Sequence, residues 1–384
     1  MRFVATADWQ LGMAAWFLPG DARARFAQAR LDAVRRIGRL AAERDAAFVL
    51  VCGDVFESNQ LDRRIVAQAF EVLRSFTVPV VLLPGNHDPL DAASIYDSSA
   101  FAAFTRGKPD HVHVLRDSVP WEVVEGVEIV GAPLRSKHPH ADLVAQACAP
   151  LDVVPSDVIR IIAGHGAVRS RPHDFGESDI TESALIDDDG LRRVLDTGRA
   201  HVAVLGDLHS TTEVAPGIWY PGTPEVTARR EPDPGNVIVV EVTKAGNVAV
   251  DKVKVGRWRF ITVEERLASM DDVEALDRRI GQIPDKDHTA VWSALTGRLT
   301  VPEDARLREI IDEAERLFAR FDPWDRHTDL AVVATDADFA AMELSGFAEA
   351  ARAELAEAAE ADGEAGLAAS DALRLFFQLA GGDR

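Results

Sequence analysis

One short stretch constrains the fold more than any other: an apolar run at residues 78–83 stops at a Pro-Gly pair and is followed at once by Asn86, His87 and Asp88. An apolar run of this length, bounded by turn residues, predicts a fully buried strand. Buried polar groups without partners cost about 1–3 kcal/mol each in proteins. We therefore expect the amide, the imidazole and the carboxylate to be paired, ligated or functional.

The N-terminal part of the chain alternates between strand and helix patterns. Strands are expected at residues 3–6, 47–52 and 78–83, and helices at residues 22–43 and 62–75. A βαβαβ order predicts a largely parallel sheet with right-handed crossovers. Further apolar runs fit a second sheet stacked on the first, in an order that the sequence does not reveal. They are residues 112–115, 121–124, 127–132, 158–163, 202–205 and 237–242.

Length and composition limit the class of protein. A chain of 384 residues suggests about two or three domains with a sizeable core. The first six residues read directly into a strand without a charged leader, and no apolar segment approaches the roughly 20 residues that span a bilayer. The two cysteines fit a reducing compartment, and Cys52 lies in an apolar run as a small buried hydrophobe would. These features favour a soluble, cytoplasmic protein with no membrane partner.

The net charge of −21 argues against simple coating of nucleic acid, which usually requires a basic surface. Residues 331–384 carry eleven acidic and three basic side chains, so about −8 of that charge belongs to the tail. A nucleic-acid site would therefore require basic groups gathered around it.

Five apolar runs each end in side chains that are able to ligate a metal. In chain order these are Asp8 and Gln10, then Asp54, then Asn86 and His87, then His165, and finally Asp207 and His209. Ligands of open α/β sheets collect at the carboxyl ends of the strands. One Gly-Asp or Gly-His pair after a strand is usually a turn, but five such strand ends in this order predict a metal centre.

These blocks resemble the five signature blocks of the calcineurin-like metallophosphoesterases. The chain further resembles the SbcD-type DNA repair exonucleases of that superfamily through residues 53–56, residues 84–88 and the segment Tyr-Pro-Gly-Thr-Pro at residues 220–224. The resemblance covers residues 1–255, the expected nuclease domain. It implies a four-layer α/β/β/α sandwich, followed by a small α+β capping domain and C-terminal helices.

The resemblance also implies two divalent ions and a set of ligands for each. One ion would be held by Asp8, Gln10, Asp54 and His209, and the other by Asp54, Asn86, His165 and Asp207. Such donors suit borderline-to-hard ions, which activate water and clamp a phosphoryl group. His87 is then the expected general acid, with Asp88 orienting its ring. The alternative for His87 is a turn residue that pairs with backbone.

Two ligand positions depart from the family pattern. Members usually carry His where Gln10 stands, and Gly-His-x-His where this chain has Asp207 before His209. The added oxygen donors make the site harder and more negative, so Mn²⁺, or else Mg²⁺, is expected rather than a softer ion. The alternative is a degraded first metal position with weak or lost catalysis.

Basic residues in the loops that follow the ligands are candidates for substrate binding, because Arg grips phosphate with two donors. They are Arg169, Arg171, Arg135 and Arg229. A plain solvated loop is the alternative for each.

Beyond residue 255 the pattern changes to a small α+β domain, residues 256–335. Strands are expected at residues 258–264, 288–300 and 330–334, and helices from the capping box Ser269-x-x-Asp272 to about residue 283 and from residue 302 to about 321. This domain resembles the capping domain that SbcD-type nucleases place over the active site. A structural or oligomerisation domain, with the chain forming a homodimer, is the alternative.

Residues 336–384 are rich in Ala and Glu, with apolar residues spaced as in two helices. Acidic helices with an apolar stripe are typical of partner-binding segments. The resemblance implies docking onto an SMC-like ATPase, and packing against the same chain is equally open.

The favoured function is a two-metal phosphodiesterase that hydrolyses DNA, as the exonuclease subunit of an ATPase–nuclease repair complex. One alternative is a phosphoesterase for a small phosphodiester or nucleotide, which the acidic charge favours. The other is a catalytically weak scaffold that binds DNA and the ATPase.

Overall fold

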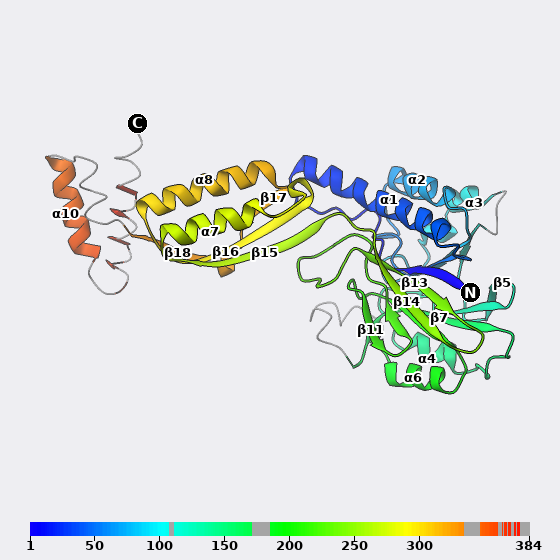
Figure 1. Ribbon diagram of the computed structural model, residues 1–384. Helices are drawn as coiled ribbons and strands as arrows, with labels where there is room; N and C mark the ends of the chain where they lie inside the picture. The colour runs from blue at the N-terminus through cyan, green and yellow to red at the C-terminus, as the bar shows by residue number, and fades with distance from the viewer. Residues whose placement is uncertain are drawn as a thin grey trace. The chain divides into compact units, whose positions relative to one another are not determined.

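The computed structural model describes residues 1–106, 111–170, 185–333 and 346–359. It also describes residues 363, 365, 366, 368, 369, 372, 373, 375 and 376. The chain divides into two compact units, Met1–Arg259 and Phe260–Arg384 (Figure 1). No helix among the described residues is both long and apolar enough to cross a membrane.

The first unit contains two six-stranded sheets, in the orders β14-β13-β1-β2-β3-β4 and β11-β12-β10-β7-β6-β5. The first sheet consists of β1 (Arg2–Thr6), β2 (Val49–Cys52), β3 (Val80–Leu83), β4 (Val112–Val114), β13 (Asn236–Val242) and β14 (Val248–Lys254). The second consists of β5 (Trp121–Val124), β6 (Val127–Gly131), β7 (Ile159–His165), β10 (Val202–Gly206), β11 (Thr212–Ala215) and β12 (Ile218–Tyr220). A separate pair is formed by β8 (Ala167–Val168) and β9 (Leu185–Ile186).

Helices cover the outer face of each sheet, and three apolar cores lie between the resulting four layers. The first sheet packs against α1 (Gly20–Glu43), α2 (Arg63–Arg74), η1 (Ile95–Asp97) and α3 (Ser99–Thr105). The second packs against α4 (Leu143–Cys148) and α6 (Asp188–Asp196). Successive strand residues point to opposite faces: Val49 and Val51 of β2 face the helices, whereas Leu50 and Cys52 face the core shared by the sheets. The predicted α/β/β/α order is therefore present.

Two apolar runs belong to a different sheet from the one expected. Residues 112–115 and 237–242 were expected in the second sheet, but β4 and β13 both lie in the first. Strand β13 pairs antiparallel with both β1 and β14. A strand that is buried on both faces has the same apolar pattern in either sheet, so the pattern could not assign it.

Register explains why the polar residues that follow the strands come together. In the first sheet β1, β2 and β3 are parallel neighbours, with Thr6 opposite Val51 and Cys52 opposite Leu83. In the second sheet β7 and β10 are parallel, with Gly206 opposite His165. Parallel strands aligned in this way end at the same edge of their sheet.

Over residues 260–333 the second unit is a four-stranded sheet with two α-helices. It contains β15 (Arg259–Leu267), α7 (Met270–Gly281), η3 (Lys286–His288), β16 (Thr289–Thr300), α8 (Val301–Leu317), β17 (Arg320–Pro323), η4 (Asp325–His327) and β18 (Asp329–Val333). The predicted cap is confirmed, since the Ser269 side chain accepts a hydrogen bond from the Asp272 N–H. A further helix, α10 (Phe347–Ala359), lies in the predicted tail, most of which is outside the described residues.

The second helix of this unit is shorter than expected. It ends at Leu317 rather than near residue 321, and β17 then pairs in parallel with β16. Phe318 and Phe321 pack into the same core as the helix. Their spacing of three residues matches the apolar face of a helix, so the apolar periodicity placed the predicted end of the helix beyond its actual end.

Candidate metal centre

Three other predicted ligands surround the Nε2 atom of His165. Asn86 Oδ1 lies 2.7 Å from this nitrogen, Asp54 Oδ1 3.5 Å and Asp207 Oδ1 3.8 Å. Asp8, Asp54 and His165 each offer one ligand atom within 4.8 Å of the others, and all three residues are buried. The structure thus gathers the side chains expected to hold the second ion.

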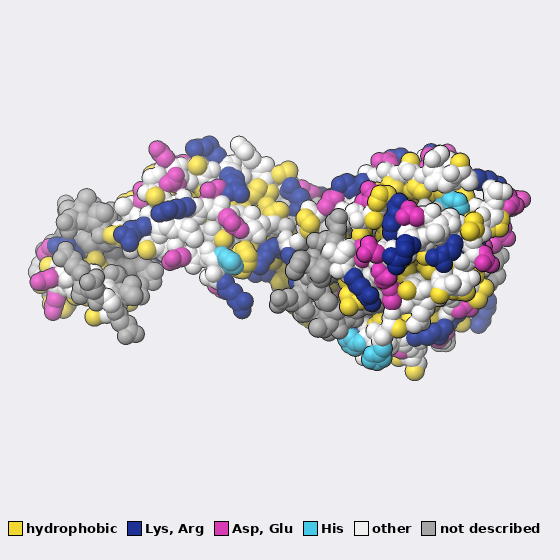
Figure 2. Space-filling view, turned by 90° about the horizontal axis from the view of Figure 1, so that it is seen from below, with side chains coloured by type: hydrophobic (Ala, Val, Ile, Leu, Met, Phe, Trp, Pro, Cys, Tyr) yellow, Lys and Arg dark blue, Asp and Glu magenta, His cyan; other side chains and the backbone are white. Residues whose placement is uncertain are grey.

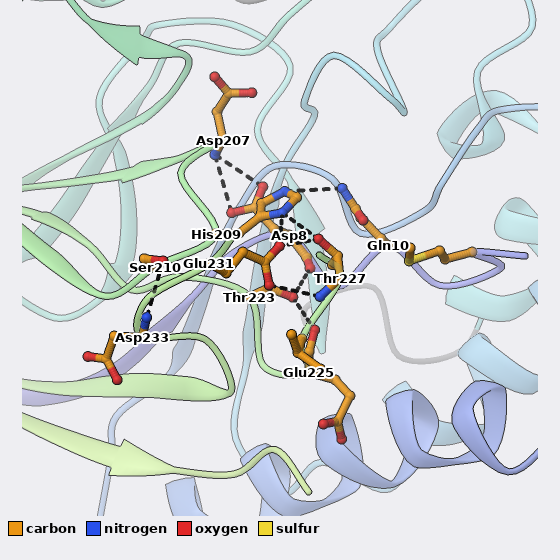
Figure 3. Close-up of polar contacts among 12 residues, drawn as sticks. Asp8, Gln10, Asp207, His209, Ser210, Thr223, Glu225, Thr227, Glu231 and Asp233 are labelled. Carbon is orange, nitrogen blue, oxygen red and sulfur yellow. Dashed lines mark hydrogen bonds and ion pairs between the residues drawn. The ribbon is translucent and has the colours of Figure 1, made fainter. Parts of the chain in front are cut away.

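The remaining predicted ligands join this cluster from the loops after β1 and β10 (Figure 3). The backbone N–H of Asp207 donates to both carboxylate oxygens of Asp8, at 3.1 and 3.2 Å. The side-chain nitrogen of Gln10 lies 3.2 Å from Nε2 of His209. The backbone N–H of Gln10 donates to the carbonyl oxygen of Asp54 at 2.8 Å. All seven predicted metal ligands therefore lie in one cluster.

Glycines precede four of these predicted ligands, and at three of the four the reason is that the strand ends are in contact with one another. A methyl group at Gly53 would lie 2.0 Å from Nδ1 of His165, and one at Gly85 would lie 2.1 Å from Oδ1 of Asp54. A methyl group at Gly206 would lie 1.8 Å from the carbonyl oxygen of Cys52. The Gly-Asp and Gly-Asn pairs in the sequence are thus a steric requirement of this packing.

Replacing Gly206 by alanine is expected to destabilise the first unit by about 3 kcal/mol or more, because the clash is with backbone and the strands must separate. The free energy of unfolding in denaturant measures the effect. Gly20→Ala is the matched control, since a methyl group at that position of α1 meets no atom within 4 Å. Equal stability of the two variants would contradict the steric explanation.

The electrostatics of the cluster favour a bound cation. Burial raises the pKa of Asp8 to about 7, with Asp54 and Asp207 adding to the rise and His209 and His165 opposing it. Burial lowers the pKa of His165, but Asp54, Asp207 and Asp8 outweigh it and bring that pKa to about 9. Carboxylate, amide and imidazole donors at the same place are a donor set for divalent ions. The residues present therefore fit divalent cations.

The prediction that Asp88 orients the ring of His87 is wrong. The Asp88 carboxylate accepts hydrogen bonds from the Gly85 N–H at 2.8 Å, the Phe56 N–H at 3.1 Å and the Tyr96 O–H at 2.6 Å. These donors hold it inside the loop, where burial, followed by Asp54, raises its pKa to about 6.

Glu57 takes the place that was expected for Asp88. Nδ1 of His87 lies 2.9 Å from the carbonyl oxygen of Glu57 and 4.0 Å from its carboxylate. Burial lowers the pKa of His87, but the Asp54 carboxylate and the Glu57 carbonyl and carboxylate outweigh burial, so that the pKa is raised.

The two tyrosines of the chain provide a matched pair that tests the role of Asp88. Both are buried and donate at 2.6 Å, Tyr96 to the Asp88 carboxylate and Tyr220 to the carbonyl oxygen of Gly166. At pH 8 we expect Tyr96→Phe to lower the free energy of unfolding by about 1.5–3 kcal/mol and Tyr220→Phe by about 0.5–1.5 kcal/mol, because bonds to charged groups are stronger.

The difference between these two variants should also depend on pH. The larger loss of unfolding free energy in Tyr96→Phe is expected above the pKa of Asp88 in the folded protein, which is about 6. It disappears as the pH falls through that value and the carboxylate gains a proton. Denaturant unfolding at pH 8 and pH 5 measures both limits. A difference that persists unchanged at pH 5 would contradict an ionised Asp88.

Residues that the sequence analysis missed hold His209 and Asp8 in place. Nδ1 of His209 lies 2.7 Å from Thr227 Oγ1 and 2.8 Å from Glu231 Oε1. The hydroxyl of Thr223 donates to the carbonyl oxygen of Asp8 at 2.9 Å. Burial lowers the pKa of His209, but Glu231 and the nearby aspartates outweigh it and raise the pKa to about 9.

Three of the four predicted substrate-binding residues lie in surface loops of the first unit. The exposed guanidinium of Arg135 donates to the carbonyl oxygen of Arg116 at 2.6 Å. Arg169 is exposed after β8, and Arg229 is half-buried in the loop that carries Glu231. Arg171 lies outside the described residues. Binding of substrate by these residues stays a prediction.

Comparisons with known proteins give a family match and distant structural similarities. The model of the calcineurin-like phosphoesterase family matches residues 1–211. A search of curated proteins found no match. The chain is similar to a dimetal phosphatase from Danio rerio, at 13% identity over 62% of this chain and 91% of that one, with a TM-score of 0.37.

Two further solved structures are similar over smaller shares of their length. The nuclease MPE of Pseudomonas putida is 19% identical over 42% of this chain and 59% of that one, with a TM-score of 0.23. The purple acid phosphatase PPD1 from seeds of yellow lupin, Lupinus luteus, is 14% identical over 66% of this chain and 51% of that one, with a TM-score of 0.38.

Proposed function

The chain belongs to the calcineurin-like phosphoesterase family, and from this premise we propose that it is a two-metal phosphodiesterase that hydrolyses DNA phosphodiester bonds. As a member of this family it is a metal-dependent phosphoesterase. The observation that supports the proposal is the convergence of the seven predicted ligands, which come from five strand ends in two sheets.

Two cations would use these side chains in two overlapping sets. One would bind Asp8, Gln10, Asp54 and His209, and the other Asp54, Asn86, His165 and Asp207, so that Asp54 is shared. When bound, such cations lower the pKa of water and neutralise charge on the phosphoryl oxygens.

The protein's own side chains would protonate the leaving group and bind the phosphates of the substrate. Nδ1 of His87 faces the carbonyl oxygen of Glu57 and therefore carries a hydrogen, which leaves Nε2 to deliver a proton. As water attacks phosphorus it releases a proton to solvent, the bond to the leaving oxygen breaks, and that oxygen takes a proton from Nε2 of His87. Arg135, Arg169 and Arg229 are proposed to bind flanking phosphates through paired N–H donors.

Two observations bear on the substrate. The net charge of −21 favours a small phosphodiester or nucleotide as the alternative substrate. Basic groups for a DNA backbone are nevertheless present, since Figure 2 shows Lys and Arg side chains between Asp and Glu on the visible face of the first unit. The second unit, which lies beyond the matched residues 1–211, adds surface that a small substrate does not need.

We further propose that the protein is the exonuclease subunit of a repair complex with an SMC-like ATPase. Support comes from α10, which has no buried residue among those described and begins at Phe347, 88% exposed. Co-purification with such an ATPase, lost when the chain is truncated after residue 335, would test this part. A homodimer is the alternative outcome.

The substrate is tested with labelled duplex DNA, labelled single-stranded DNA and a chromogenic phosphodiester, each incubated with Mn²⁺. DNA degradation that Asp54→Ala abolishes and Asp251→Ala retains supports the proposal. Asp251 is the control because it is an exposed carboxylate on β14 that pairs with Arg44 at 3.0 Å. Turnover of the chromogenic ester alone would favour the small-substrate alternative, and DNA binding without any hydrolysis would favour a scaffold.

Manganese is expected to support the highest rate, followed by magnesium, because most of the donors are oxygen atoms. A series of hydrolysis rates with Mn²⁺, Mg²⁺ and Zn²⁺ on metal-stripped protein measures the order. Highest activity with zinc would show that the two imidazoles dominate the site instead.

A further inference from the structure

The ring of His209 is held from both sides (Figure 3). Nδ1 is 2.7 Å from the hydroxyl of Thr227 and 2.8 Å from the carboxylate of Glu231, while Nε2 is 3.2 Å from the side-chain nitrogen of Gln10. The Glu231 side chain is only 6% exposed. Its second oxygen accepts from the Thr227 N–H at 2.9 Å, so the carboxylate is anchored by its own loop.

This arrangement determines which ring nitrogen is able to bind a cation. A carboxylate only accepts hydrogen bonds, so the nitrogen facing Glu231 carries the hydrogen. The nitrogen left to bind a cation is therefore Nε2, beside the side chain of Gln10. Carboxylates behind metal-binding histidines generally fix the tautomer and the ring angle in this way, and their loss weakens metal binding about 10–100-fold.

We infer that Glu231 is a positioning residue, which presents Nε2 of His209 to the first of the two proposed cations. The inference rests on the ligand set given in the proposed function. It has particular weight in this chain, because the carboxamide of Gln10 is a weak donor and the first cation must rely on His209 and the two carboxylates of Asp8 and Asp54. A ring free to rotate or to change tautomer would leave that cation poorly held.

The test measures cation binding in the absence of substrate. Calorimetric titration of metal-stripped protein with Mn²⁺ should show two binding steps, of which Glu231→Ala weakens one by about 10–100-fold and leaves the other unchanged. Glu231→Gln keeps an acceptor oxygen and is expected to lose less affinity. Glu241→Gln is the matched control, since this exposed carboxylate on β13 pairs with Arg2 outside the cluster.

A spectroscopic measurement reports the position of the hydrogen directly. With the diamagnetic ion Zn²⁺ bound, long-range ¹H–¹⁵N spectra should show the hydrogen of His209 on Nδ1 in the parent, and a mixed or reversed tautomer in Glu231→Ala. If Glu231→Ala does not fold, as judged by circular dichroism, Thr227→Val replaces it, because it removes the other partner of Nδ1.

The inference would be overturned if the folded variants bound Mn²⁺ with the affinity of the parent. It would also be overturned if both binding steps weakened equally, because that result indicates a merely structural role for Glu231. The outcome does not depend on the substrate. If Glu231→Ala selectively weakens one cation while the parent cleaves no DNA, the inference stands and the proposed function fails.

Discussion

Asp54→Ala is expected to remove DNA hydrolysis almost completely, by roughly 10⁴-fold or more, since the shared carboxylate belongs to both proposed cation sites. Each cation supplies several kcal/mol of transition-state stabilisation, and every 1.4 kcal/mol or so is about tenfold in rate. The side chain also accepts a hydrogen bond from the His87 N–H at 3.0 Å, so the loop that carries the proton donor loses a contact as well.

Thermal unfolding separates lost metal binding from lost structure in this variant. The parent should be stabilised by Mn²⁺, by about 2.7 kcal/mol at a concentration of 100 Kd, whereas Asp54→Ala should show no such gain. Without metal, the variant should unfold at nearly the same temperature as the parent. The variant loses a hydrogen bond, but it also has one buried carboxylate fewer, and the two effects offset each other. Retention of hydrolysis in a folded Asp54→Ala would contradict the shared-ligand assignment.

His87→Ala should lower kcat by roughly 10²–10⁴-fold with little change in KM, the range found for the loss of a general acid. Metal binding should be unaffected, since His87 is not among the predicted ligands and its Nδ1 faces the carbonyl oxygen of Glu57. Steady-state kinetics with a labelled duplex measures the change.

His111→Ala is the matched control for His87. Its ring nitrogen also contacts a backbone carbonyl, that of Leu73, at 3.0 Å, but His111 precedes β4 and so lies at the opposite edge of the sheet. A loss confined to KM in His87→Ala would indicate substrate binding instead of proton transfer. A chromogenic ester with a good leaving group should be much less affected, because it needs no proton on departure.

The clustering of the residues in the candidate metal centre could be predicted from sequence because the relevant signal is local. Each follows an apolar run that stops abruptly, and glycine precedes Asp54, Asn86, His165 and Asp207. Aligned parallel strands end at one edge, so neighbours in the sheet are also neighbours in the site. Asp54 and His165 are more than a hundred residues apart and follow strands of different sheets, so the stacking of the two sheets is what brings them together.

The supporting contacts could not be predicted because tertiary hydrogen bonds decide them. Asp88 directly follows His87, yet three donors turn its carboxylate away, and a carbonyl of Glu57 from another strand end meets the ring instead. Glu231 lies 22 residues beyond His209 in a stretch of charged residues that has the pattern of an ordinary solvated loop. No local pattern marks such a residue.

The division of ligands between the sheets has a mechanical consequence. Asp8, Asp54 and Asn86 follow strands of the first sheet, while His165, Asp207 and His209 belong to the second, and an apolar core lies between the two sheets. Any ion bound among these side chains would cross-link the two sheets. Chelation should then loosen the shared core and speed amide exchange in β2 and β7, so metal supply would control how rigid the fold is as well as whether the site is active.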